Sequence, residues 1–263
     1  MTALAALAAI YPPPPAQKWN PALDWQPVPY DTLPYDEDDL LYWYNCPRYL
    51  WLRDRVYELP EVATTLRSYR ELFSYLTQYT GTNVTTPEQV FFLDNLFQTL
   101  DNVNIRPPKW AQDVMLQIKA MTKIEYAIET FNDELKRLAA GVLMKEILNA
   151  TNAAIAGFTE QPKLRLYSAH ENNVATVMAA AGVFEAHQPN YGATFSLELR
   201  RHQLTGRYGI TAVYSPVAGG PEEILNVKGC GDTPFCDYAT FLKLTESVMW
   251  SRKDFETQCP RRN

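Results

Sequence analysis

Long apolar runs are missing from this 263-residue sequence, in which the longest run, from Ala3 to Ile10, is far shorter than the roughly 18–20 residues that cross a bilayer. Clusters of basic residues are missing too. The 24 Lys and Arg are outnumbered by 30 Asp and Glu, which gives a formal net charge of −6. We therefore predict no membrane span, and we do not expect nucleic acid to be a partner. The hydrophobic fraction of 46% is typical of a globular protein that buries a core.

Several motifs that carry catalysis are absent as well. No pair of His or Cys residues has the spacing of a zinc site, and five residues separate Cys230 from Cys236. Gly219 and Gly220 precede a proline and no helix, so they do not form a phosphate-binding loop. A Gly-x-Ser-x-Gly elbow is also lacking. We predict neither a metal site nor a cofactor.

Four cysteines and two glycosylation sequons bear on the compartment. The sequons begin at Asn83, in a turn-like break, and at Asn149, near a predicted helix end and therefore partly shielded. An even cysteine count allows two disulfides, and together these features favour an oxidising compartment over four free thiols in a reducing one. Met1 to Ile10 is too short and lacks the basic start of a signal peptide, so we predict an alanine-rich helix there.

Proline density divides the chain. Ten of the 19 prolines lie before residue 61, which predicts an extended segment without a long helix. Asp36 to Asp39 fit the acidic first turn of a helix and a solvated loop equally well. From Pro47 to Ala156 apolar residues recur at helical spacing, with breaks at Gly81–Pro87 and Ile105–Pro108.

The pattern changes after residue 160. We predict a buried strand at Lys163–Ser168 and an amphipathic helix at Asn172–Phe184. Further strands and a closing helix are expected at Thr194–Arg200, Arg207–Tyr214, Glu223–Val227 and Asp237–Met249. This order of elements indicates an α/β domain that carries a helical insertion.

The turn between that strand and helix is the one place where chemistry is expected. In open α/β sheets ligands bind beyond the carboxyl ends of strands, and helix N-termini favour anions. His170 and Glu171 lie in this turn, where they could bind phosphate and supply a proton to a leaving group. The spacing alone favours a simpler interpretation, in which Glu171 and Asn172 cap the helix. His187 and His202 are expected at the surface.

A resemblance to a known protein family favours the catalytic interpretation of this turn. The segment Leu164–Val174 resembles the His-Asp segment of the histidine acid phosphatases, and it is most similar to the animal branch with the prostatic, lysosomal and venom enzymes. The similarity runs nearly end to end, through further segments in the same order: Leu7–Pro12, Trp19–Pro21, Trp25–Pro29, Asn45–Arg48, Pro189–Ala193, Leu197–Leu199 and Gly229–Cys230 with Cys236 and Cys259.

The resemblance implies an α/β core of the phosphoglycerate-mutase type, with residues 1–46 and 161–263 in the core and residues 47–160 as the mainly helical insertion. It also implies hydrolysis of small phosphate monoesters through a phosphohistidine intermediate. The family's nucleophile belongs to an Arg-His-Gly-x-Arg-x-Pro motif, whose arginines clamp the phosphoryl oxygens. Its His-Asp pair corresponds here to His170, a phosphate contact, and Glu171, a proton donor that is one methylene longer than aspartate.

The Arg-His-Gly motif is absent from the sequence. By the match at Leu7–Pro12 it would precede Met1, so we expect this chain to lack the nucleophile and the first strands of the sheet, and to be inactive alone. The complete protein would be secreted or lysosomal, with a signal peptide that this chain does not contain. The alternative is a non-catalytic interaction protein of the same fold. A homodimer is compatible with either interpretation.

The resemblance also implies the disulfide pairing. It predicts bridges Cys46–Cys259 and Cys230–Cys236. A third bridge of the prostatic type is not expected, because Thr194 stands at the matching position.

Overall fold

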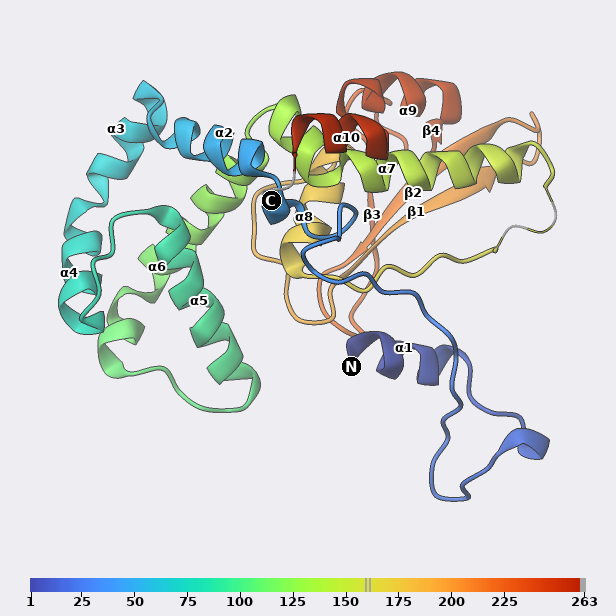
Figure 1. Cartoon of the computed structure of the whole chain (residues 1–263), viewed down its shortest axis with the longest axis horizontal. Helices are drawn as coiled ribbons and strands as arrows, with labels where there is room; N and C mark the ends of the chain where they lie inside the picture. Colours follow the sequence, from blue (N-terminus) through green and yellow to red (C-terminus); the bar gives the residue numbers. More distant parts are fainter. Residues whose placement is uncertain (159, 161, 261–263) are drawn as a thin grey trace.

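The computed structural model describes residues 1–158, 160 and 162–260, which form two regions that lie side by side (Figure 1). The helical region consists of α2 (Pro47–Tyr57), α3 (Pro60–Ser68), α4 (Arg70–Thr80), α5 (Pro87–Asn102) and α6 (Lys109–Glu129). The sheet region contains β1 (Thr194–Arg201), β2 (Tyr208–Ser215), β3 (Glu223–Leu225), β4 (Cys236–Asp237), α1 (Thr2–Ile10), α7 (Asp133–Ile155), α8 (Glu171–Ala180), α9 (Tyr238–Thr245) and α10 (Arg252–Gln258).

Helix ends in the helical region follow from local sequence. Pro47, Pro60 and Pro87 each occupy the first turn of a helix, where a missing backbone N–H costs nothing. Thr86 and Gln89 form a capping box at the start of α5. Gly81 ends α4 in the left-handed conformation with φ of 69°. The helices and breaks predicted between residues 47 and 156 are therefore confirmed.

The sheet is antiparallel and centred on β2. β1 pairs with one edge of β2 in the register Leu197↔Ala212, and β3 and β4 pair in succession with the other edge. One core contains buried side chains of α7, α8, β2 and α9: Leu143, Met144, Leu148, Val177, Ala180, Ile210, Ala212 and Phe241. Because α8 packs into this core, its position on the sheet region is fixed, and so is the position of the turn that precedes it.

The long helix α7 joins the two regions. Its residues Leu135, Leu138 and Val142 pack in a second core with Trp43 and Tyr49, while Leu143 and Met144 face the core of the sheet region. The division into residues 1–46, 47–160 and 161–263 stays a prediction, and residues 161 and 263 of that division lie outside the described part.

The N-terminal segment matches its prediction in outline. α1 is helical as expected, and the proline-rich chain after it is extended and loops away from the rest of the molecule (Figure 1). Residues 36–39 form a loop and no helix, because Asp38 Oδ1 accepts hydrogen bonds from the backbone N–H groups of Leu40 and Leu41 at 2.9 and 2.8 Å.

The predicted buried strand at Lys163–Ser168 is wrong. These residues are extended but belong to no sheet, and Leu164 and Leu166 are 58% and 45% exposed. A strand needs a neighbour that satisfies its backbone N–H and C=O groups, and none of the described strands pairs with this segment.

The other elements after residue 170 need smaller corrections. The predicted amphipathic helix ends earlier than expected, because Gly182 turns the chain with φ of 75°. The predicted closing helix is divided into α9 and a 3-10 turn at Glu246–Val248. The short helix α10, capped by Ser251, was not predicted.

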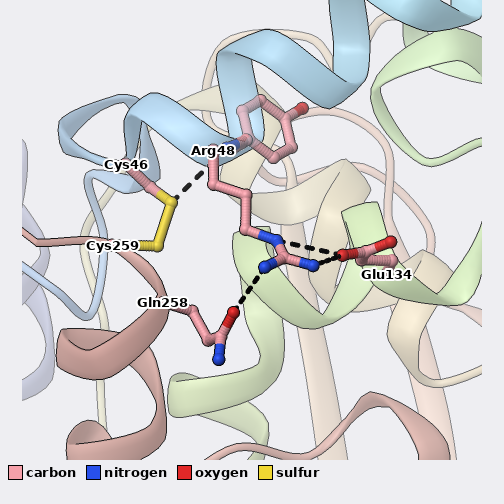
Figure 2. The surroundings of a disulfide bond; sticks show 6 residues. Cys46, Arg48, Glu134, Gln258 and Cys259 are labelled. Carbon is pink, nitrogen blue, oxygen red and sulfur yellow. Dashed lines mark hydrogen bonds and ion pairs between the residues drawn. A yellow bond between two sulfur atoms is a disulfide. The ribbon is translucent and has the colours of Figure 1, made fainter.

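Both expected disulfides are present. Cys46–Cys259 joins the start of α2 to the chain after α10, with a Cα–Cα distance of 4.7 Å (Figure 2). Beside it Arg48 reaches from α2 to Glu134 on α7, with Nε at 3.0 Å from Oε1, and also contacts Gln258. Cys230–Cys236 closes a short loop with a Cα–Cα distance of 5.2 Å.

Both sequon asparagines are accessible. Asn83 is exposed in the break after α4, as expected. Asn149 lies inside α7, and its side chain is exposed, so the expectation that it is partly shielded is wrong.

Candidate active site

The predicted pair His170–Glu171 lies at the start of α8. His170 is exposed, and its backbone N–H donates to Asn173 Oδ1 at 3.0 Å. Asn173, which is 5% exposed, also donates from Nδ2 to the carbonyl of Leu41 at 2.8 Å. Asn173 thus fixes the turn, while the imidazole of His170 remains accessible at the end of a ten-residue helix whose first N–H groups favour anions.

Glu171 is half-buried and contacts the helical region. Its Oε1 accepts a hydrogen bond from Asn95 Nδ2 on α5 at 3.3 Å. Asn95 Oδ1 in turn accepts from Gln188 Nε2, in the loop after α8. The candidate proton donor is therefore held between the two regions, by residues that are distant from it in the sequence.

A buried cluster of ionisable residues lies in the helical region near this turn. Glu125 and Glu129, one helical turn apart on α6, are each 1% exposed. Tyr57 donates from its hydroxyl to Glu125 Oε2 at 2.8 Å, and Tyr44 donates to Glu129 Oε1 at 2.8 Å. Arg53, which is 5% exposed, pairs with Glu88.

Burial shifts the protonation of this cluster. Burial, together with the charge of Glu129, raises the pKa of Glu125 to about 8. Burial also raises the pKa of Glu129 to about 7, although the hydrogen bond from Tyr44 and the charge of Arg53 oppose the rise. Both carboxyls are therefore protonated in acidic solution. The cluster was not predicted from the sequence, although two acidic residues at i and i+4 on an apolar helix face could have indicated it.

Tyr126 connects this cluster electrostatically to the candidate site. The tyrosine is fully buried, and burial together with the charges of Glu171 and Glu129 raises the pKa of its hydroxyl. It thus stays a neutral phenol between the two sets of carboxyl groups.

The remaining histidines are not part of this arrangement. His187 is half-buried, with Nε2 at 2.8 Å from the Tyr214 hydroxyl, so the expectation of a plain surface residue is wrong. His202 is exposed as expected, and with Arg207 it lines a pocket of about 430 Å³ that includes neither His170 nor Glu171.

Among the described residues, no group of three or more His, Cys, Asp or Glu side chains is arranged to hold a metal ion. No helix in this part of the chain is long and apolar enough to span a membrane.

Comparison with characterised proteins supports the resemblance to the histidine acid phosphatases. Prostatic acid phosphatase of Bos taurus is 32% identical over 273 aligned residues, which cover 100% of this chain and 68% of the relative. Venom acid phosphatase Acph-1 of Apis mellifera is 28% identical over 94% of this chain and 64% of the relative. Lysosomal acid phosphatase of Homo sapiens is 29% identical over 98% of this chain. The chain thus spans about two thirds of the length of these relatives, or slightly less.

The fold agrees with this assignment. The solved structure of the phytase from Citrobacter braakii superimposes with a TM-score of 0.55, over 78% of this chain and 67% of the phytase, at 11% sequence identity. At that identity the similarity concerns the fold alone, and it confirms the α/β class. Residues 1–209 match the histidine phosphatase superfamily, branch 2. Together with the acid phosphatase relatives, this match shows that the chain belongs to the histidine acid phosphatase family within that branch.

Proposed function

We propose that this chain supplies the phosphate contact and the proton donor of a histidine acid phosphatase that hydrolyses small phosphate monoesters. The observation that carries the proposal is the His170–Glu171 turn. It places an accessible imidazole and a hydrogen-bonded carboxyl together at the N-terminus of α8. Helix N–H groups and an imidazole N–H attract a phosphate ester, and the neighbouring carboxyl would supply a proton to its leaving oxygen.

In the proposed reaction a nucleophilic histidine, provided by the family's Arg-His-Gly motif, attacks phosphorus. The ester P–O bond breaks as the P–N bond forms, and the proton of Glu171 moves to the departing alkoxide oxygen. Water then attacks the phosphohistidine, and the P–N bond breaks as the new P–O bond forms. Glu171 takes up a proton of the attacking water, and inorganic phosphate leaves the restored histidine. His170 holds the phosphoryl oxygens throughout. General acid catalysis of this kind contributes roughly 10²- to 10⁴-fold to the rate.

Residues 1–263 contain no Arg-His-Gly sequence, and we propose that they do not turn over phosphate esters unaided. The missing attacking group and the missing arginine clamp would each cost roughly three to four orders of magnitude in rate. His170 and Glu171 replace neither of them.

The test compares two proteins. One consists of residues 1–263, and the other, the extended protein, carries in addition an N-terminal segment with the Arg-His-Gly motif from a relative. Both are assayed at acidic pH with an alkyl phosphate and with 4-nitrophenyl phosphate. We expect turnover only from the extended protein, with a loss on both esters in His170→Ala and a loss on the alkyl phosphate in Glu171→Ala. Turnover by residues 1–263 that His170→Ala abolishes would place the nucleophile elsewhere and overturn the proposal.

A second candidate function is a non-catalytic interaction protein of the same fold. The two candidates differ in the extended protein. If it is well folded, binds phosphate and still hydrolyses no ester, the interaction protein becomes the preferred function.

We further propose that the chain passes through the secretory route, since two disulfides and two exposed sequon asparagines suit an oxidising compartment. Expression behind a signal peptide should give a protein whose gel mobility increases after glycosidase treatment. Asn83→Gln and Asn149→Gln should each remove part of that shift, and an unchanged mobility would contradict glycosylation.

A further inference from the structure

A row of polar side chains leads from the interior of the helical region to the candidate proton donor. Asp94 on α5 is fully buried, and its Oδ1 lies 2.6 Å from Lys119 Nζ on α6. The same ammonium donates to Gln188 Oε1 at 3.2 Å. Gln188 Nε2 donates to Asn95 Oδ1, and Asn95 Nδ2 donates to Glu171 Oε1 at 3.3 Å. The row thus contains residues of α5, of α6 and of the loop after α8, and it ends at Glu171 on α8.

The direction of this row follows from chemistry. An ammonium group only donates hydrogen bonds, so Lys119 selects the carbonyl end of the Gln188 amide. The amide nitrogen of Gln188 must then face Asn95, and it selects the carbonyl end of Asn95. The remaining Asn95 amide nitrogen therefore points at Glu171. The buried charge of Asp94 holds Lys119 in place, and so determines how two uncharged amides are oriented.

We infer that Asn95 is a positioning residue for Glu171, oriented by Lys119 through Gln188, an inference that rests on the proposed function for its catalytic meaning. Asn95 occupies Oε1, which leaves Oε2 to carry the proton that is given to the leaving oxygen. After that transfer the hydrogen bond from Asn95 Nδ2 stabilises the carboxylate that forms. The contact also tethers a side chain that is one methylene longer than the aspartate expected from the family resemblance.

The hydrogen-bond row can be tested on the 263-residue protein itself, without any activity. The side-chain amide ¹⁵N signals of Asn95 are followed by NMR between pH 3 and 7, with Asn95→Leu to assign them. We expect the signals to move with one transition, and this movement to disappear in Glu171→Gln. In Lys119→Met the movement should fall to less than half, because either orientation of the two amides then becomes accessible. An equal movement in Glu171→Gln would overturn the inference.

The catalytic consequence is measured in the extended protein. A proton donor matters for an alkyl leaving group and little for 4-nitrophenolate, which leaves unprotonated. Asn95→Leu should therefore lower kcat/KM for an alkyl phosphate about tenfold, the effect of one hydrogen bond to a charged group, and kcat/KM for 4-nitrophenyl phosphate less than twofold. A merely structural defect would lower both equally. The matched control is Asn102→Leu on the same helix, since Asn102 is exposed and its amide bonds only to Gln98 O among the described residues.

The two proposals fail in different ways. If Glu171→Gln hydrolyses both esters as fast as the extended protein, the proposed function is wrong. If Glu171→Gln discriminates between the esters and Asn95→Leu does not, the proposed function survives and the positioning role is overturned.

Discussion

The helical region buries four charged side chains, Arg53, Asp94, Glu125 and Glu129, whereas the buried polar residues of the sheet region, among those described, are uncharged: Asn173, Thr176, Thr211 and Thr245. Buried charges are stable only when they are paired or neutralised. The helical region should therefore depend on pairing and protonation, and the sheet region on apolar packing alone. The polar row to Glu171 starts in the helical region, so the candidate proton donor, on α8 of the sheet region, accepts its hydrogen bond from the region that buries charges.

The largest effect is expected from cutting the link between the regions. Cys46–Cys259 spans 213 residues, so Cys46→Ser with Cys259→Ser should lower the free energy of unfolding by about 5 kcal/mol in the chain-entropy model. The control, Cys230→Ser with Cys236→Ser, opens a separation of only 6 residues and should cost about 2 kcal/mol. Urea unfolding measures both. Equal losses would show that the long bridge does not couple the regions.

Removing one partner of the buried cluster should come next. Arg53→Met leaves Glu88 without its cation and removes a positive charge that lowers the pKa of Glu125 and Glu129, so we expect a loss of about 3–4 kcal/mol. Thermal and urea unfolding provide the measurement.

Arg55→Met on the same helix is the matched control for Arg53→Met. Arg55 pairs with Glu58 at the exposed surface, and such pairs contribute at most about 1 kcal/mol. If both variants lost the same stability, the contrast between buried and exposed pairs would not hold in this helix.

Acidic pH should stabilise the helical region, whereas it destabilises most proteins. The folded-state pKa values of Glu125 and Glu129, about 8 and about 7, lie above the ordinary value of 4.5. The folded state then binds more protons than the unfolded state between these limits. Stability is therefore fully present below about pH 4.5 and is lost as the pH rises towards 8, by about 2 kcal/mol for each of the two carboxyls between pH 5 and 7.

Unfolding in urea at several pH values tests this slope. Glu125→Gln with Glu129→Gln should flatten the dependence, because neither amide titrates. A protein whose stability rises over the same range, or a double variant with an unchanged slope, would contradict the account of the cluster.

Features that depend on local burial could be predicted from the sequence, whereas features that depend on distant partners could not. Helical spacing between residues 47 and 156 reflects local burial, so the helices were predicted well. The strand at Lys163–Ser168 was not, because composition indicates that a segment suits a sheet and does not show whether a neighbour pairs with it. Glu171 and Asn95 lie 76 residues apart, and no local pattern links them. Glu125 and its tyrosine partner Tyr57 lie 68 residues apart, so no local pattern links this pair either.

The smallest effects are expected from removing helix caps, and these effects should be equal in the two regions. Equal effects would show that the two regions differ in their cores and not at their helix ends. Thr86 caps α5 in the helical region, and Ser251 caps α10 in the sheet region, each through a hydrogen bond to the backbone N–H three residues later, at 3.3 and 3.2 Å. Thr86→Ala and Ser251→Ala should each cost about 1 kcal/mol. Ser74→Ala, inside α4 and exposed, should stay within about 0.5 kcal/mol. A cap that costs several times more in one region would mean that its helix end is coupled to the core beneath it.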